Sequence, residues 1–467
     1  MVFAAVLAVG LAGYLPLSQA LNGPHDVDEA VYYTAARAWL TGARPYLDFV
    51  YTQPPLSLIL LMPAVLLDFV GGQQPAGFLA GRVLSTICLA ATAALIWQLF
   101  ITRYQSRPAA LAAVLLVLLD PITNVVGHYI MLEPVINLLT ILALVLSLDS
   151  RWTLAAVVAG MAVVTKSQGV LALVPVLAVA CARRDWRNLV RSCAIAGALT
   201  MGVLGIGSWL TSGELLQQAV LFQFVRPSEH SLADDGGLLG WLTAPETRVL
   251  AAFALLGLTR IRKAWDVDKG ATAAVLCWIA FSFVLVARSY SYYYHYWPQV
   301  ALPLALVGGF VVLAPATVAL SKVRRASLAV MALALVRSEL QVAAFRAGDG
   351  AASLIRAHAA QMSTIGFDPA VWANIVLNQS APAVDGKLVI DGYATKQYLQ
   401  LRPFSVARIW APYDWQSMGS TLIRESDWVW TDPKGERLLL PDQQALRSSL
   451  FVEDYGQGSY LLYSRTA

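Results

Sequence analysis

The sequence is poor in charge. Only 13% of its 467 residues are Asp, Glu, Lys or Arg, while 58% are hydrophobic; soluble domains are roughly 25% charged and about 45–50% apolar. A soluble protein of this size needs a charged, hydrated exterior, so the composition excludes an ordinary cytosolic enzyme. It indicates a protein whose apolar surface is covered by lipid.

Other features that the sequence lacks exclude further classes of function. The net charge is only +4, so the charge balance gives no support for nucleic-acid binding. No glycine-rich phosphate-binding loop is evident, which agrees with a protein that needs no nucleotide. A disulfide framework is not expected, because the few cysteines all lie in apolar stretches. They are Cys88, Cys181, Cys193 and Cys277.

Long hydrophobic runs are abundant. Crossing the hydrocarbon core takes about 20 apolar residues, and the hydropathy predicts an α-helical polytopic membrane protein with about eleven transmembrane helices. The first run is not expected to be a secretory signal, because it has no basic flank and no good small-residue cleavage site. The helices are expected near residues 2–21, 79–101, 109–127, 134–149, 152–167, 168–182, 192–210, 247–260, 272–289, 297–316 and 326–344.

Basic residues predict the orientation, since Lys and Arg in short loops favour the cytoplasmic side. The opposite loops then lie outside and hold most of the acids. The apolar segment from Pro54 to Val70 is short and proline-rich, so we expect an interfacial or re-entrant helix on the outer side. The basic loops contain Arg103 and Arg107; Arg183, Arg184, Arg187 and Arg191; Arg260, Arg262 and Lys263; and Lys322, Arg324 and Arg325.

The composition changes after about residue 345, where long apolar runs end. We therefore expect residues 1–344 to form a transmembrane domain with outer loops 22–78 and 127–134. Residues 345–467 are expected to form a small, soluble, extracytoplasmic α/β domain. Within it we expect a helix at 351–365 and strands at 387–390, 428–430 and 460–463.

The first outer loop concentrates acids: Asp26, Asp28 and Glu29 lie within four residues. One interpretation is a hydrated loop in which Asp26 or Asp28 caps the following helix. On a helix starting near Asp28, however, Glu29 lies one turn from Tyr32 or Tyr33, so a carboxylate and a phenol face one cavity. Neighbouring carboxylates raise one pKa or recruit a metal, and either effect suits a general base.

A second acid, Glu133, precedes Pro134 in the next outer loop. It either stabilises the start of a helix or lines a cavity together with Asp120 and His128, as ionisable residues at membrane depth usually do. We expect acids from the two loops, Asp28 and Glu133, to converge on one pocket at the rim of the bilayer.

Two further features lie at the predicted outer surface. Lys166 either snorkels to the headgroups or pairs with a phosphate. The segment from Arg288 to Pro298 contains five tyrosines, His295 and Trp297. Such a run is mostly an aromatic belt, of which part can stack on a sugar.

These residues, in this order, resemble a known family. The chain resembles the GT-C membrane glycosyltransferases that use polyprenyl-phosphate sugars, a group containing protein O-mannosyltransferases and the lipid A aminoarabinose transferase. The resemblance covers about residues 1–320 and rests on an ordered set of motifs. They are Asp28-Glu29, Gly42 to Tyr46, Gln53-Pro54-Pro55-Leu56, Leu132-Glu133-Pro134, Val164-Thr165-Lys166 with Gly169, and the aromatic run into Pro298.

The resemblance implies a GT-C-like helical domain with an outer cavity. It also implies inverting transfer of a sugar from a polyprenyl monophosphate to an acceptor hydroxyl on the outer face of the plasma membrane. Asp28 matches the catalytic first-loop aspartate, Glu29 would support it, and Glu133 matches the second-loop acid of the acceptor or metal site. The substrate-binding candidates are Asp26, Tyr32, Gln53, His128, His295 and Tyr296.

The sequence departs from the family at three points. Relatives of the lipid A type carry lysine where Gln53 stands and arginine where Val31 stands. The family's Lys-Gly step is matched only in part, because two residues separate Lys166 from Gly169. Donor phosphate binding is therefore expected from Lys166, Arg44 and Arg288.

The implied partners are a polyprenyl-phosphate sugar, membrane lipid and a lipid, glycan or protein acceptor, without nucleic acid. No cofactor is expected to be required, and a role for a divalent cation stays open. One alternative is a transporter or flippase of a lipid-linked or polar substrate, but the inverted repeats typical of many transporters are not visible. A second alternative is a non-catalytic subunit in envelope biosynthesis, in which the acids only cap helices.

Overall fold

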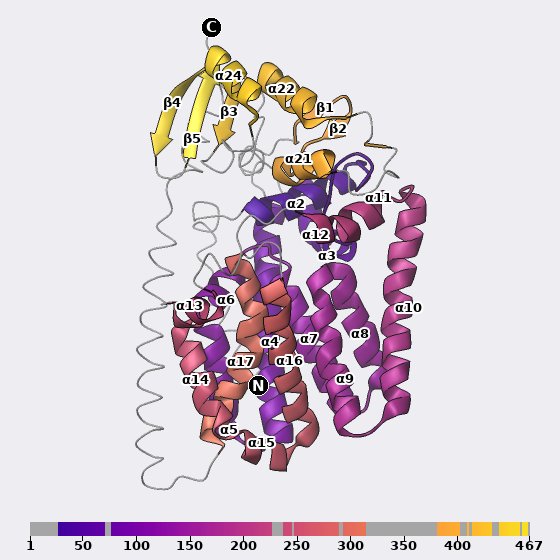
Figure 1. Cartoon of the computed structure of the whole chain (residues 1–467), viewed down its shortest axis with the longest axis vertical. Helices are drawn as coiled ribbons and strands as arrows, with labels where there is room; N and C mark the ends of the chain where they lie inside the picture. The colour runs from indigo at the N-terminus through magenta and orange to yellow at the C-terminus, as the bar shows by residue number, and fades with distance from the viewer. Residues whose placement is uncertain are drawn as a thin grey trace. The chain divides into compact units, whose positions relative to one another are not determined.

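The computed structural model describes residues 27–70, 76–226, 237–244, 247–288, 293–313, 381–401, 409–410, 413–431, 439–457 and 460–465. The chain divides into two compact units (Figure 1). Unit 1 comprises residues 1–15, 83–203 and 227–344, and unit 2 comprises residues 16–82, 204–226 and 345–467.

All regular secondary structure among the described residues of unit 1 is helical. Helices α4 (Ala76–Arg103) and α10 (Trp186–Leu210) each begin in one unit and end in the other. The remaining elements of unit 1 are α5 (Arg107–Leu118), α6 (Pro121–Val126), α7 (Glu133–Leu148), α8 (Trp152–Thr165), η2 (Ser167–Ala172), α9 (Leu173–Ala182), α13 (Gly237–Thr243), α14 (Arg248–Leu258), α15 (Ile261–Val267), α16 (Lys269–Arg288), η4 (Tyr294–Tyr296), α17 (Trp297–Gly309) and η5 (Phe310–Val312).

The apolar runs between residues 79 and 313 form helices, as hydropathy predicted. Among the described residues, four helical segments are long and apolar enough to cross a membrane: Ala76–Arg103, Trp186–Leu210, Lys269–Arg288 and Tyr294–Val312. The number eleven stays a prediction, and the runs 2–21 and 326–344 lie outside the described residues.

One predicted helix, 109–127, is wrong as a single element. The helix ends at Leu118, and a new one begins at Pro121 after Asp120. Asp120 caps the second helix by accepting a hydrogen bond from the Thr123 amide at 2.9 Å, and proline is favoured directly after a cap. A local polar signal thus overrides the continuous hydrophobic pattern.

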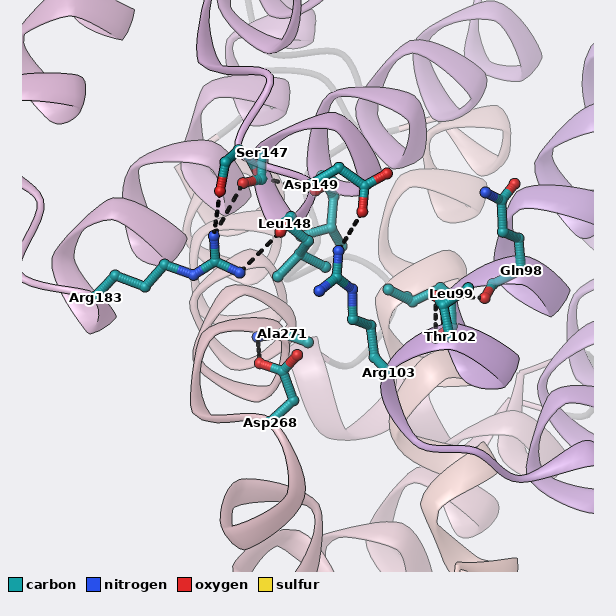
Figure 2. Close-up of polar contacts among 12 residues, drawn as sticks. Gln98, Leu99, Thr102, Arg103, Ser147, Leu148, Asp149, Arg183, Asp268 and Ala271 are labelled. Atoms are coloured by element: carbon teal, nitrogen blue, oxygen red, sulfur yellow. Dashed lines mark hydrogen bonds and ion pairs between the residues drawn. The ribbon is translucent and has the colours of Figure 1, made fainter.

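Charged side chains form ion pairs and hydrogen bonds at several helix ends of unit 1 (Figure 2). Arg103, at the end of α4, forms an ion pair with Asp149, which follows α7. Arg183 donates to the carbonyl of Leu148 at 2.9 Å, and so satisfies one of the carbonyls that the end of α7 leaves without a helical partner. Asp268 accepts from the Ala271 amide at 2.9 Å and caps α16. These basic residues belong to the loops predicted to be cytoplasmic.

Unit 2 combines the first loop region with the C-terminal segment. Its elements are α2 (Val27–Leu40), α3 (Leu56–Val65), η1 (Leu66–Phe69), α11 (Glu214–Leu216), the π-helix η3 (Gln217–Leu221), α12 (Phe222–Val225), β1 (Ala383–Val384), β2 (Lys387–Leu388), α21 (Gly392–Leu401), α22 (Trp415–Glu425), β3 (Trp428–Thr431), α24 (Pro441–Leu450), β4 (Phe451–Gln457) and β5 (Tyr460–Arg465). The segment Pro54–Val70 is helical over α3 and η1, as expected. Its interfacial or re-entrant position on the outer side stays a prediction.

The described part of the C-terminal segment contains both helices and strands. Strands β3 and β4 pair antiparallel with β5 in the order β3-β5-β4, and β1 pairs with β2. The strands predicted at 428–430 and 460–463 are confirmed, whereas the strand predicted at 387–390 covers only Lys387 and Leu388. The helix predicted at 351–365 lies outside the described residues.

The core of the C-terminal segment extends to residues distant in sequence. Trp410, Trp415 and Tyr398 pack in one apolar cluster with Val50 of the first loop and Phe222 of α12. The Leu388 amide also donates to the Asp48 carbonyl at 2.8 Å. The C-terminal segment is therefore packed and hydrogen-bonded against the first loop. The extracytoplasmic placement of residues 345–467 and the boundary at 344 stay predictions.

Candidate functional site

The first acidic pair opens helix α2. Asp28 and Glu29 lie in its first turn, where negative charge interacts favourably with the helix dipole. Asp28 is partly exposed, and the Tyr32 hydroxyl approaches its Oδ2 at 3.5 Å, one helical turn away. Burial, and to a smaller extent the negative charge of Asp28, raise the pKa of Tyr51. Asp28 is thus a partly exposed carboxylate beside the phenol of Tyr32.

Glu29 has a different environment, because it is fully buried and paired with Arg82. The Arg82 Nε donates to Oε2 at 3.0 Å and Nη2 donates to Oε1, so that both oxygens are occupied. The guanidinium also lies 4.9 Å from the centre of the Phe78 ring. A fork of this kind fixes geometry strongly. Glu29 therefore joins α2 to the start of α4.

Each of the two tyrosines that follow Glu29 has a hydroxyl directed to another carboxylate. The Tyr33 hydroxyl donates to Asp68 of η1, which also accepts from the Gly77 amide at 2.6 Å. The Tyr32 hydroxyl points to Asp28, as stated above. Helix periodicity alone could not predict these partners, because Arg82 and Asp68 are distant in sequence.

The second acid, Glu133, is the first residue of α7 and pairs with Lys166. Both side chains are buried, and the Lys166 Nζ donates to Glu133 Oε1 at 2.6 Å. The other oxygen, Oε2, is buried and has no hydrogen-bond partner among the described residues. The Lys166 ammonium also lies 4.8 Å from the centre of the Tyr296 ring. Lys166 is thus a buried cation held by an acid and an aromatic ring.

The chain turns sharply at Lys166, and Gly169 permits this turn. Lys166 is extended (φ −154°, ψ 143°) between α8 and η2, and its carbonyl accepts from the Gly169 amide at 2.8 Å. A Cβ on Gly169 would lie 1.9 Å from the Ala162 carbonyl oxygen. The glycine of the Lys166 motif therefore has a packing role, since the chain passes directly against α8.

Asp120 is a satisfied structural residue. Besides the Thr123 amide it accepts from the Thr123 hydroxyl at 2.6 Å and from the indole Nε1 of Trp297 at 2.8 Å. Asp120 thus holds α6 to α17, and this arrangement favours the structural interpretation of this acid.

The remaining candidates of unit 1 have the following positions. His128 Nδ1 lies 3.2 Å from the Thr86 hydroxyl. His295 is buried, stacks on Tyr293 with ring centres 5.4 Å apart, and meets the edge of Tyr296 at 4.7 Å. Arg288 is exposed at the end of α16. Tyr296 therefore links His295 to the Lys166–Glu133 pair.

In unit 2, Arg44 is exposed and binds Asp48 through two hydrogen bonds of 3.0 Å. That interaction lowers the pKa of Asp48. The Gln53 carbonyl accepts from the Tyr46 hydroxyl at 2.8 Å, while Gln53 Oε1 is buried without a hydrogen-bond partner among the described residues. Asp26 lies outside the described residues.

The predicted site residues are distributed over the two units. Asp28, Glu29, Tyr32, Arg44 and Gln53 belong to unit 2, whereas Glu133, Lys166, His128, Arg288, His295 and Tyr296 belong to unit 1. The convergence of Asp28 and Glu133 on one pocket stays a prediction. In the described part of the chain, no group of three or more His, Cys, Asp or Glu side chains is arranged to hold a metal ion.

Two charged residues were missed in the sequence. Arg82 lies inside a predicted membrane helix, and an ionisable residue there is by itself a sign of a specific role. Glu214 follows an apolar helix and is also fully buried. Neither residue belongs to a recognisable motif. The only feature of the sequence that could have indicated a specific role for them was a charged residue within or next to an apolar stretch.

Comparisons with known proteins identify the fold. Residues 71–212 match the family model described as dolichyl-phosphate-mannose-protein mannosyltransferase. Among solved structures, ArnT from Cupriavidus metallidurans bound to undecaprenyl phosphate is similar with a TM-score of 0.64 and 13% identity, over 99% of this chain and 98% of that one. No curated protein sequence matches this chain significantly.

A second similar structure is the Archaeoglobus fulgidus oligosaccharyltransferase tethered to an acceptor peptide containing the NVT sequon. Its TM-score is 0.52 at 11% identity, over 100% of this chain and 74% of that one. These findings confirm the resemblance to the GT-C superfamily of membrane glycosyltransferases. The chain has the fold of these structures, and four of its described helical segments are long and apolar enough to cross a membrane.

Proposed function

We propose that this chain is an inverting glycosyltransferase that moves a sugar from a polyprenyl-monophosphate donor to an acceptor hydroxyl on the outer face of the plasma membrane. The donor class is supported by the matching mannosyltransferase model and by the similar ArnT structure, which holds undecaprenyl phosphate. In this proposal the C-terminal segment is extracytoplasmic and the acceptor is a lipid, glycan or protein.

The observation that carries the proposal is the difference in environment between the adjacent residues Asp28 and Glu29. Glu29 is buried and bound to Arg82 through both oxygens, whereas Asp28 is partly exposed at the start of α2. A general base must reach the proton that it removes and must be able to accept it. Of the two acids Asp28 is the one that solvent reaches, and we assign it as the base.

The proposed reaction is a single displacement. Asp28 takes the proton of the acceptor hydroxyl as the acceptor oxygen forms a bond to the anomeric carbon. The bond between that carbon and the phosphate oxygen breaks, and polyprenyl phosphate leaves with the bonding electrons. Attack opposite the leaving group inverts the anomeric centre.

Charge on the leaving phosphate needs cationic stabilisation, for which Lys166, Arg44 and Arg288 are the candidates. Lys166 is held by Glu133 in a buried position, so its ammonium is fixed before any donor binds. Arg44 and Arg288 are exposed. The spare oxygen of Glu133 is suited to accept a hydrogen bond from the acceptor or to ligate a divalent cation; the reaction as written requires no cofactor.

The test is sugar transfer by purified protein in lipid nanodiscs supplied with a polyprenyl-phosphate sugar. Asp28→Asn should insert and fold normally, because asparagine is also accepted at a helix start, but transfer should fall by about 10²–10⁴-fold. Asp185→Asn is the matched control, since Asp185 accepts from the Asn188 amide at 3.2 Å at the start of α10. Its activity should equal that of the wild type.

Full activity in Asp28→Asn would remove the base assignment. If the wild-type protein released no sugar but moved a labelled donor across proteoliposomes, the transporter alternative would replace the proposed function.

A further inference from the structure

The segment that follows α10 has an unusual backbone. Ser212 and Gly213 both have positive φ, at 52° and +92°, and η3 begins soon afterwards as a π-helix at Gln217. Left-handed conformations at a residue other than glycine cost free energy, and single π-turns occur frequently at functional sites. Such features persist when surrounding interactions hold them. The side chains of this segment show what holds them.

Glu214 is the centre of a buried polar network. Its side chain has no exposure. Oε2 accepts from the Tyr398 hydroxyl at 2.6 Å and from Gln218 Nε2 at 3.1 Å. Oε1 has no hydrogen-bond partner, and Glu214 forms no ion pair, among the described residues. Burying a carboxyl group in this way is costly, so the network is poorly explained as a stabilising device alone.

Gln218 connects this network to the first loop. Its Nε2 donates to the Tyr46 carbonyl at 2.8 Å, and its Oε1 accepts from the Tyr51 amide at 3.0 Å. The indole of Trp410 donates to the same Tyr46 carbonyl at 2.9 Å. Tyr46 itself is left-handed, with φ 69°. Two distant segments thus hold a strained residue of the loop from 46 to 53.

The loop held in this way is connected to the helix that carries the proposed base. The loop leads into α3, and α3 packs against α2, which has Asp28 in its first turn. The Tyr51 hydroxyl is hydrogen-bonded to the Ser57 hydroxyl at 2.8 Å. The Tyr46 hydroxyl donates to the Gln53 carbonyl. A shift of Tyr46 and Tyr51 would therefore change the surroundings of Asp28 and Gln53.

We infer that Glu214, Gln218 and Tyr398 are positioning residues, which through the loop from 46 to 53 set the surroundings of Asp28. The inference rests on the proposed function and connects α21 of the C-terminal segment (Figure 1) to the loop from 46 to 53 through Tyr398, Glu214 and Gln218. None of the three residues needs to touch the substrate. Their effect is transmitted by the Tyr46 and Tyr51 backbone groups.

The test compares Glu214→Ala and Tyr398→Phe with Glu214→Gln. Glu214→Ala removes the acceptor of two hydrogen bonds, while Glu214→Gln keeps an acceptor oxygen of similar shape. Tyr104→Phe is the matched control, because Tyr104 is buried and shares one hydrogen bond of 3.1 Å with the Thr272 hydroxyl in unit 1. Each variant is studied as the full chain in nanodiscs.

Two measurements are made on each variant. Hydrogen exchange of peptides covering residues 46–53 should become faster in Glu214→Ala and Tyr398→Phe, and should be restored in Glu214→Gln. The turnover number should fall about tenfold, the factor that corresponds to one lost buried hydrogen bond, with a smaller change in the donor KM. Tyr104→Phe should change neither quantity, although its melting temperature should fall as much as that of Tyr398→Phe.

The two readouts separate the inference from the function. Unchanged exchange at 46–53, or faster exchange with unchanged turnover, would overturn the positioning role. If the wild-type protein transfers no sugar, the proposed function fails, while the exchange data still decide whether the network holds the loop. If Glu214→Ala does not fold, Tyr398→Phe provides the same comparison.

Discussion

Each unit has a buried acid in the first turn of a helix, and each acid pairs with one basic side chain. The two acids differ in how many of their carboxylate oxygens have a hydrogen-bond partner. Glu29 contacts Arg82 through both carboxylate oxygens. Glu133 contacts Lys166 through one oxygen and keeps the other without a partner among the described residues. The cation explains the difference, because a guanidinium offers a planar fork and an ammonium a single point of charge. A fully occupied acid is an anchor, whereas one with a spare oxygen can still bind a hydroxyl or a cation.

The largest expected effect comes from removing one cation. Arg82→Met and Lys166→Met each leave a buried carboxylate without its partner, and each should lower the free energy of unfolding by about 3–5 kcal/mol. The double variants Glu29→Met/Arg82→Met and Glu133→Met/Lys166→Met should regain most of that stability, because no isolated charge remains buried. Thermal unfolding in nanodiscs measures both effects.

Transfer activity then separates the two pairs. We expect the Glu29/Arg82 double variant to keep transfer and the Glu133/Lys166 double variant to lose it despite its recovered stability. Equal activity of the two double variants would show that the spare oxygen of Glu133 and the ammonium of Lys166 make no contribution to the reaction.

A smaller effect is expected from isosteric replacement of each acid. Glu133→Gln keeps the shape of the side chain but removes the charge at the spare oxygen, so turnover should fall roughly 10–10²-fold, as for a lost hydrogen bond to a charged group. Glu29→Gln should lower the melting temperature and leave turnover unchanged. A loss of turnover in Glu29→Gln that matches the loss in Glu133→Gln would contradict the distinction between anchor and site.

The smallest effect concerns the ion pair Arg44–Asp48. Unlike the two buried pairs, it is in contact with water. The hydrogen bond from Arg44 lowers the pKa of Asp48 below its value in the unfolded chain, which is about 3.9. The pair therefore contributes stability above about pH 4, and that contribution is lost as the pH falls through the lower, folded pKa. Because Arg44 is exposed, the contribution should be small.

Melting curves between about pH 3 and pH 6 measure this effect. The difference in melting temperature between the wild type and Asp48→Asn should be present at the upper end and shrink towards the lower end. A difference that stays constant over this range would show that ionisation of Asp48 plays no part.

The sequence predicted the helices well because hydropathy is a local property. The runs that became α4, α7, α8, α10, α14, α16 and α17 could be placed without knowledge of any partner. The error at 109–127 arose because the cap formed by Asp120 and Pro121 is only two residues long and lies inside an apolar run. A window of about 20 residues averages over such a signal.

The partners of the site residues could not be predicted in the same way. Glu29 and Arg82 are 53 residues apart, and Glu133 and Lys166 are 33 apart. Sequence spacing within one helix gives neighbours three or four residues away, but it gives no information on contacts between helices. The motifs indicated which residues to examine; the structure then showed that Arg82 contacts both carboxylate oxygens of Glu29 and that Glu133 binds Lys166.

The long sequence separation within unit 2 has a consequence for biosynthesis. Lys387 donates to the Leu47 carbonyl across 340 positions, and Trp410 to the Tyr46 carbonyl across 364. During translation the loop therefore leaves the ribosome long before the residues that complete its hydrogen bonding. A chain stalled before Lys387 would leave the Leu47 carbonyl without the Lys387 ammonium and the Asp48 carbonyl without the Leu388 amide, so the loop would be incompletely hydrogen-bonded until translation resumed.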